Sequence, residues 1–291
     1  MKVEKTLDVW LTAPVAAAYS LMFSPNGQKL VSGGSFKTII VWEFEQALPK
    51  HLLRGHSDWV YAVAISPDNQ TIVSSSLDKT IKTWNLNTGK EIHTLKGHLD
   101  TVCSIAISPD SKTIISGSKD GTIRVWDLLS GQEIGIFNNY PDWVYAVAVS
   151  PDNQTIVSGC ADGIIYLNKM AKLLGHSGGV TTVAISPDGQ KIASGSIDET
   201  IIIWNLNTGQ KLATLKGHAG GVSCLTISLD GKKLISGGND KIVKVWDLKT
   251  GKNLHNFQGH LEAILSVAIS PNGKFIASGS RYECLKIWVL D

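Results

Sequence analysis

Short apolar segments alternate with polar turn residues along almost the whole chain. Residues 55–85 show the pattern: one apolar run (residues 60–65) ends at the turn residues Ser66-Pro67-Asp68-Asn69, a second covers residues 71–74, and a third ends at Trp84. Alternating β-branched residues bounded by Pro, Asn and Asp predict short antiparallel strands joined by hairpins. Such a unit is a small sheet with an apolar face, so neighbouring units have to cover it.

Copies of this unit recur at a nearly constant interval. The serine that opens the first turn recurs every 42 residues, with one interval of 36, at Ser24, Ser66, Ser108, Ser150, Ser186, Ser228 and Ser270. The closing tryptophan recurs at Trp42, Trp84, Trp126, Trp204, Trp246 and Trp288, and Asn168 stands where a seventh would fall. A period of about 42 residues matches the four-stranded blade of a β-propeller. We therefore expect seven blades in a single domain over residues 1–291.

Two dipeptides lie in phase with this period. Gly-His pairs end at His56, His98, His176, His218 and His260, and Trp-Asp pairs begin at Trp126 and Trp246. With these motifs the chain resembles the WD-repeat β-propeller family over nearly its whole length, and its near-identical repeats resemble highly repetitive bacterial members. The resemblance implies an all-β, seven-bladed propeller of four-stranded antiparallel blades. It also implies that the chain can be a module of a larger kinase or NTPase chain.

Two blades depart from the regular pattern. The last unit stops three residues after Trp288 and so lacks a fourth strand, whereas residues 3–11 align with that strand in the other units. We expect the N-terminal strand to complete blade 7 and close the ring, because an open array would leave sheet edges exposed. Six residues are missing between Asn168 and Gly175, which predicts a shortened blade 4.

The resemblance also implies a structural hydrogen-bond network within each blade. Carried over by position, four blades hold a complete set: His56, Ser74, Asp78, Trp84; His98, Ser116, Asp120, Trp126; His176, Ser194, Asp198, Trp204; and His218, Ser236, Asp240, Trp246. The chemistry fits, because a buried indole N–H needs an acceptor, which a hydroxyl supplies while donating onward. Blades 1, 4 and 7 break the set, with Pro14 and Phe36, Tyr140 and Asn168, and Tyr282. Four equivalent Ser-His-Asp copies argue against catalysis, since an active site needs one constellation. We predict no catalytic residue.

Composition narrows the function classes. A net charge of +2 and a pI near 8.2 do not indicate the strongly basic surface that is typical of nucleic-acid binding. No apolar stretch reaches the roughly 18 residues of a membrane span. The four cysteines lie in four different repeats without CxxC spacing, so neither a disulfide framework nor a zinc site is indicated. We expect no metal or cofactor and a reducing, cytoplasmic compartment.

Function is expected where residues break the repeat at a common surface. Three positions per blade should face the mouth of the central channel: the third and fifth residues after His, and the residue before the turn Asp. The predicted partner-binding residues at these positions are Tyr19, Trp59, Tyr61, Leu77, Lys119, Trp143, Tyr145 and Arg281. Aromatic side chains supply large contact area and dominate binding hot spots.

These positions predict a non-catalytic, monomeric scaffold that binds a protein or peptide partner. Three alternatives stay open. The motif DWVYAVA occurs at both residues 58–64 and 142–148, so the aromatic residues can be copied repeat sequence. An enzyme or a glycan-binding lectin with its site in the central channel would use the same mouth.

Overall fold

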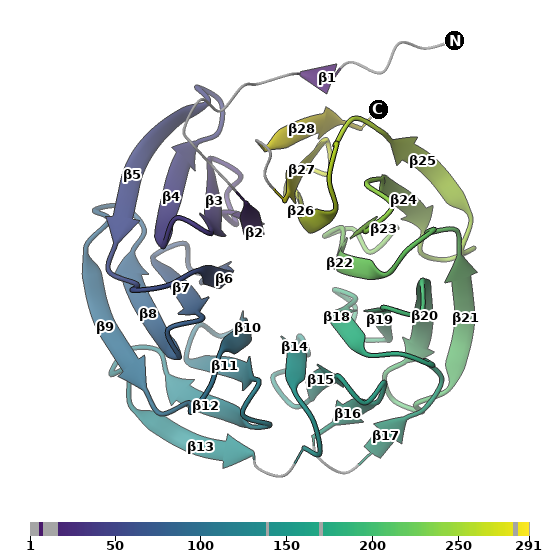
Figure 1. Cartoon of the computed structure of the whole chain (residues 1–291), viewed down its shortest axis with the longest axis horizontal. Helices are drawn as coiled ribbons and strands as arrows, with labels where there is room; N and C mark the ends of the chain where they lie inside the picture. The colour runs from purple at the N-terminus through teal and green to yellow at the C-terminus, as the bar shows by residue number, and fades with distance from the viewer. Residues whose placement is uncertain (1–5, 8–16, 138–139, 169–170, 282–284, 291) are drawn as a thin grey trace.

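Each repeat of alternating apolar and polar residues forms one radial blade of a ring. The computed structural model describes residues 6–7, 17–137, 140–168, 171–281 and 285–290. These residues form seven four-stranded antiparallel sheets and no helix. In blades 1 to 6 the first strand lies nearest the central axis and the last lies at the circumference, whereas in blade 7 the N-terminal strand of the chain is the outermost (Figure 1). The predicted seven-bladed, all-β propeller is confirmed.

The strands of blades 1 to 4 follow chain order. Blade 1 comprises β2 (Ala18–Phe23), β3 (Lys29–Gly34), β4 (Thr38–Glu43) and β5 (Leu48–Arg54). Blade 2 comprises β6 (Val60–Ile65), β7 (Thr71–Ser76), β8 (Thr80–Asn85) and β9 (Glu91–Lys96). Blade 3 comprises β10 (Val102–Ile107), β11 (Thr113–Ser118), β12 (Ile123–Asp127) and β13 (Glu133–Phe137). Blade 4 comprises β14 (Val144–Val149), β15 (Ile156–Cys160), β16 (Ile165–Leu167) and β17 (Ala171–Leu173).

Blades 5 and 6 repeat this order, and blade 7 takes its outer strand from the other end of the chain. Blade 5 comprises β18 (Val180–Ile185), β19 (Lys191–Ser196), β20 (Thr200–Asn205) and β21 (Lys211–Lys216). Blade 6 comprises β22 (Val222–Ile227), β23 (Lys233–Gly238), β24 (Val243–Asp247) and β25 (Asn253–Phe257). Blade 7 comprises β26 (Ile264–Ile269), β27 (Phe275–Ser280), β28 (Lys286–Val289) and β1 (Thr6–Leu7).

Ring closure is made by the pairing of β1 with β28. Thr6 lies opposite Trp288 and Leu7 opposite Ile287 in an antiparallel register. Figure 1 shows β1 beside β28 at the outer edge of the last blade. Of residues 3–11, which were expected to form this strand, only Thr6 and Leu7 lie within the described residues.

The hydrophobic core consists of clusters that each join neighbouring blades. One cluster combines Val31 and Ile39 of blade 1 with Val60, Ile72 and Trp84 of blade 2. Each closing tryptophan is buried in such a cluster, which forms the seam between two neighbouring blades. Small residues allow the seams to close: a Cβ on Gly33 would lie 2.6 Å from the Val60 side chain of the next blade. Thus each blade buries its apolar face only against its neighbour.

Blade 4 keeps four strands although it lacks the closing tryptophan. Its third and fourth strands have three residues each. Asn168 accepts a hydrogen bond from the Ile156 N–H at 2.8 Å and donates one to the Gln154 carbonyl at 3.0 Å. Tyr166 is buried, and its hydroxyl donates to Asp162 at 2.7 Å. The blade therefore replaces the usual network with a different one.

Deleting residues 1–11 should cost far more stability than an ordinary terminal trim. The deletion removes β1 and leaves the edge of β28 unpaired, so we expect the melting temperature to fall by more than about 5 °C, since each kcal/mol lost shifts it by roughly 2–4 °C. Thermal unfolding followed by circular dichroism measures the effect, and a deletion of residues 1–4 is the control. Equal melting temperatures for the 1–11 deletion and the full chain would show that β1 does not hold the ring closed.

Candidate functional site

A β-bulge at the start of each innermost strand shapes the mouth of the channel. The pairing of the first two strands slips at one residue in every blade, namely at Tyr19, Tyr61, Cys103, Tyr145, Thr181, Ser223 and Leu265. These are the fifth residues after the His position. Because a bulge interrupts the regular strand register and re-aims the side chain, this position has the same irregular geometry in all seven blades.

A second recurring contact joins the other two mouth positions. In blade 2 the Leu77 N–H donates to the Trp59 carbonyl at 2.9 Å, and in blade 4 the Ala161 N–H donates to the Trp143 carbonyl at 2.9 Å. The same bond occurs in the remaining five blades. The third residue after His and the residue before Asp are therefore neighbours at one end of every blade.

Three of the predicted aromatic residues form one stack across blades 1 and 2. The ring of Tyr19 lies 5.6 Å from that of Trp59 and 5.2 Å from that of Tyr61, both in stacked orientation. Burial, followed by the neighbouring Tyr19, raises the pKa of Tyr61 above its usual value, so its phenol stays protonated near neutral pH. Trp59 keeps 39% of its surface exposed. The stack therefore presents one accessible indole on a rigid aromatic base.

A second group forms at blades 3 and 4. The Trp143 ring meets Tyr145 edge to face at 6.0 Å, and the Lys119 ammonium lies 4.7 Å from the centroid of Trp143. Trp143 is 44% exposed. Cys103 lies at the bulge position between the two groups, and burial raises the pKa of its thiol to about 12. The Cys103 thiol is therefore protonated near neutral pH.

The remaining two predicted residues lie at the same end of the blades but outside the two groups. Leu77 is half-buried above the Trp59 carbonyl. Arg281 is exposed, and its backbone forms a bridge with Ala17 of blade 1. Exposed apolar residues outside the predicted set also lie at this end: Phe36, Leu99, Ile197 and Leu261. Leu99 and Leu261 both directly follow the repeat His, a position that carries no distinctive sequence signal.

The His-Ser-Asp-Trp sets form continuous hydrogen-bond chains inside four blades. In each, the indole N–H donates to the Ser Oγ at 2.8–2.9 Å, and that Oγ lies 2.8 Å from the His Nε2. The His Nδ1 lies 2.8–2.9 Å from the Asp carboxylate. Because the indole can only donate and the carboxylate can only accept, Trp donates to Ser, Ser donates to His, and His donates to Asp. The neutral histidine therefore carries its proton on Nδ1. Both ring nitrogens are engaged.

Two other blades hold part of this chain. In blade 7, His260 Nε2 and Trp288 Nε1 each lie 2.7 Å from the Ser278 Oγ. Tyr282, which stands at the Asp position, lies outside the described residues. In blade 1, Trp42 donates to Ser32 at 3.0 Å, Phe36 stands at the Asp position, and Pro14 lies outside the described residues.

The network carboxylates make stability depend on pH. Burial alone would raise the pKa of Asp78, but the hydrogen bonds from His56, Thr80 and the Ser57 N–H outweigh it and hold the pKa well below its usual range. The pKa is also lowered at the equivalent carboxylates of the other three blades, Asp120, Asp198 and Asp240. Burial lowers the pKa of His176, although its hydrogen bond to Asp198 acts in the opposite direction.

Acidification should therefore destabilise the fold. A carboxylate whose pKa is lowered by folding contributes stability above its unfolded pKa of about 3.9 and loses it as pH falls further. The lowered pKa of His176 adds a loss that begins below about pH 6.5. Urea unfolding between pH 7 and pH 3 measures the curve. Asp78→Asn should lower the free energy of unfolding by about 1–3 kcal/mol at pH 7 and by less at pH 3. The exposed Glu199→Gln is the control, and an equal loss for Asp78→Asn at both pH values would contradict the assignment.

Within the described part of the chain, no helix is long and apolar enough to cross a membrane, and no group of three or more His, Cys, Asp or Glu side chains could hold a metal ion. A search of the curated proteins finds no match. Comparison with protein-family models finds the WD domain, G-beta repeat in six segments, at residues 48–85, 89–127, 131–167, 168–205, 209–247 and 251–289. Together these segments cover most of the chain, which therefore belongs to the WD-repeat, G-beta repeat family.

Proposed function

We propose that the protein is a non-catalytic scaffold that binds a protein or peptide partner at the channel mouth. The observation that carries this proposal is the pair of aromatic groups, Tyr19 with Trp59 and Tyr61, and Trp143 with Tyr145 and Lys119. Trp and Tyr in rigid, partly buried settings contribute most to binding hot spots because little entropy is lost when a partner docks.

Exposed apolar side chains at the mouth positions add to the proposed contact surface. Trp59, Trp143 and Ile197 stand at these positions, and each is at least 39% exposed. A monomeric protein rarely exposes many large apolar side chains together unless they meet a partner. Leu77 and Arg281 complete the proposed contact set, with Arg281 as a positive group for an acidic partner residue.

The state of the histidines favours binding over catalysis. The side chains of His56, His98, His176 and His218 are no more than 1% exposed, and both ring nitrogens of each are already bonded. A general base must reach the proton that it abstracts, which these rings cannot do without breaking the blade network. The free thiols of Cys103, Cys160 and Cys224 lead us to propose a reducing, cytoplasmic setting.

Removing both exposed indoles tests the proposed site. Peptides selected on the wild-type protein from a random display library should bind the Trp59→Ala/Trp143→Ala variant at least tenfold more weakly, because truncating a hot spot costs about 2 kcal/mol or more. Fluorescence anisotropy with a labelled peptide measures the affinity.

The matched control is Ile92→Ala/Ile134→Ala, which removes two exposed side chains from the outer strands β9 and β13. That variant should retain wild-type affinity, and both variants should melt within a few degrees of the wild type. Undiminished peptide binding by the double tryptophan variant would refute the site.

A further inference from the structure

The turns of blade 6 carry a group of lysines on the face opposite the channel mouth. In each blade, the turn between the first two strands and the turn between the last two strands lie at the strand ends away from the mouth. In blade 6 these turns are residues 228–232 and 248–252. They contain Lys232, Lys249 and Lys252, all of which are exposed.

Backbone hydrogen bonds bring the three lysines together. The Leu248 N–H donates to the Lys232 carbonyl at 2.8 Å, which places Lys232 beside the turn that begins with Leu248 and Lys249. The Asp247 N–H donates to the Lys252 carbonyl at 2.9 Å and closes that turn. A fourth ammonium group reaches the same place from blade 5, because Lys191 donates to the Leu248 carbonyl at 3.4 Å.

The same turns of blade 5 show that the fold does not require these charges. One repeat upstream, the three positions are Gln190, Asn207 and Gln210. The backbone bond between the two turns is nevertheless the same, with the Leu206 N–H donating to the Gln190 carbonyl at 2.8 Å. The three lysines of blade 6 are therefore a departure in charge on an unchanged backbone.

The two carboxylates in these turns of blade 6 are engaged with the turns themselves. Asp230 accepts hydrogen bonds from the Ser228 hydroxyl and the Lys232 N–H. Asp247 accepts from the Thr250 hydroxyl at 2.8 Å and from the Lys249 N–H at 3.1 Å. The ammonium groups of Lys232, Lys249 and Lys252 form no ion pair or hydrogen bond within the described part of the chain. They are available to an anionic partner.

Leu229 is a second departure from the repeat, at the tip of the first turn of blade 6. The other six blades have a proline there: Pro25, Pro67, Pro109, Pro151, Pro187 and Pro271. A Cβ on Gly231 would lie 3.8 Å from Pro187 of the preceding blade, whereas a Cβ on Gly273 would meet no described atom of another turn within 4 Å. Leu229 is 64% exposed, so its side chain is accessible beside the lysines.

We propose that Leu229, Lys232, Lys249 and Lys252, here called the basic turn surface, bind an acidic segment of a partner protein. The lysines attract the carboxylates and set the orientation, while Leu229 packs against an apolar side chain of the segment. Leu229 is the one exposed large apolar residue in the described turns of blade 6. An anionic membrane fits less well, because stable membrane binding also needs a larger inserted apolar area.

This inference goes beyond the proposed function and does not rest on it. The basic turn surface and the channel mouth lie at opposite ends of the blades, so one propeller can hold two partners at the same time. An aromatic mouth and a basic surface select partners of different chemistry, which suits a scaffold that brings two proteins together.

Fluorescence anisotropy with two labelled octapeptides tests the basic turn surface in the full chain. The acidic probe is Glu-Glu-Leu-Glu-Glu-Leu-Glu-Glu, and its neutral counterpart has Gln in place of every Glu. We expect saturable binding of the acidic peptide, binding of the neutral peptide that is at least tenfold weaker, and weaker binding of the acidic peptide at high salt, because salt screens exposed charges.

Two double variants locate the site. Lys232→Gln/Lys252→Gln should weaken binding of the acidic peptide at least fivefold and leave the melting temperature unchanged, since blade 5 has Gln at both positions. The matched control is Lys112→Gln/Lys90→Gln, which makes the same changes at the equivalent positions of blades 3 and 2 and should bind as the wild type does. Leu229→Pro, which restores the residue of the other blades, should weaken binding of the acidic peptide but not its dependence on salt.

Absence of saturable binding of the acidic peptide, equal binding of the neutral peptide, or an equal loss in the control variant would each overturn the proposal. Binding of phosphatidylserine vesicles or of a single-stranded oligonucleotide in preference to the acidic peptide would also overturn it. The Trp59→Ala/Trp143→Ala variant should bind the acidic peptide as the wild type does, so this surface and the channel mouth can fail independently.

Discussion

Each blade of this protein depends on its neighbour to bury an apolar face. The four-stranded sheets are too small to enclose a core alone, and the clusters of buried Val, Ile, Leu and Trp side chains lie between sheets. Such an arrangement is satisfied everywhere only when the first and last blades also meet. The blade 7 residues Leu285 and Ile287 pack with Ile40 and Trp42 of blade 1 in one cluster, and the β1–β28 pairing completes blade 7.

The sequence repeat and the structural blade are out of step by one strand. The first segment that matches the family model, residues 48–85, contains β5 of blade 1 and the three inner strands of blade 2. Each sequence unit therefore links two blades covalently as well as through the seam. Side chains strengthen this link: His51 on β5 bonds the Asn87 carbonyl of blade 2 at 2.8 Å, and His93 on β9 bonds the Leu129 carbonyl of blade 3 at 2.9 Å.

The period of the tryptophans is enough to predict the blade number, the strand order and the closure, because these follow from periodic apolar burial. It does not predict the mouth geometry. The bulge at Tyr61 lies between Val60 and Ala62, and nothing in the local sequence marks it as a backbone irregularity. His51 and His93 each contact the next blade, and no sequence pattern marks these contacts, because they depend on how the blades are rotated against one another. The aromatic stack of Tyr19 on Tyr61 likewise depends on two adjacent bulges.

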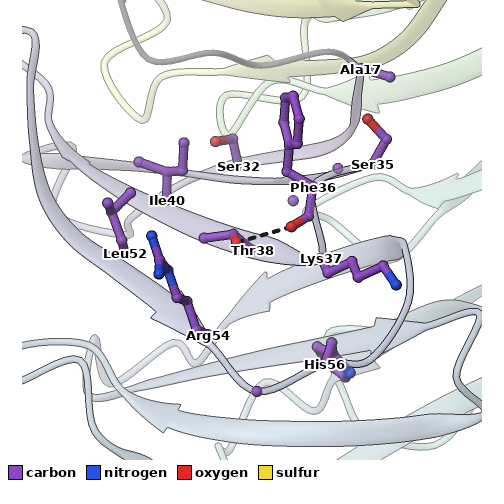
Figure 2. A pocket seen from close by; sticks show the side chains of 13 residues that line it. Ala17, Ser32, Ser35, Phe36, Lys37, Thr38, Ile40, Leu52, Arg54 and His56 are labelled. Atoms are coloured by element: carbon purple, nitrogen blue, oxygen red, sulfur yellow. Dashed lines mark hydrogen bonds between the residues drawn. The ribbon is translucent and has the colours of Figure 1, made fainter.

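Because the blades share one backbone plan, each serves as a control for the others, and departures from the plan carry the functional information. Blade 4 loses His and Trp but fills the space with Tyr140 and Tyr166, whose rings meet edge to face at 5.0 Å. Blade 1 has Phe36 at the Asp position (Figure 2), and its Trp42 indole still donates to Ser32 at 3.0 Å. A loss that is refilled in this way preserves the scaffold.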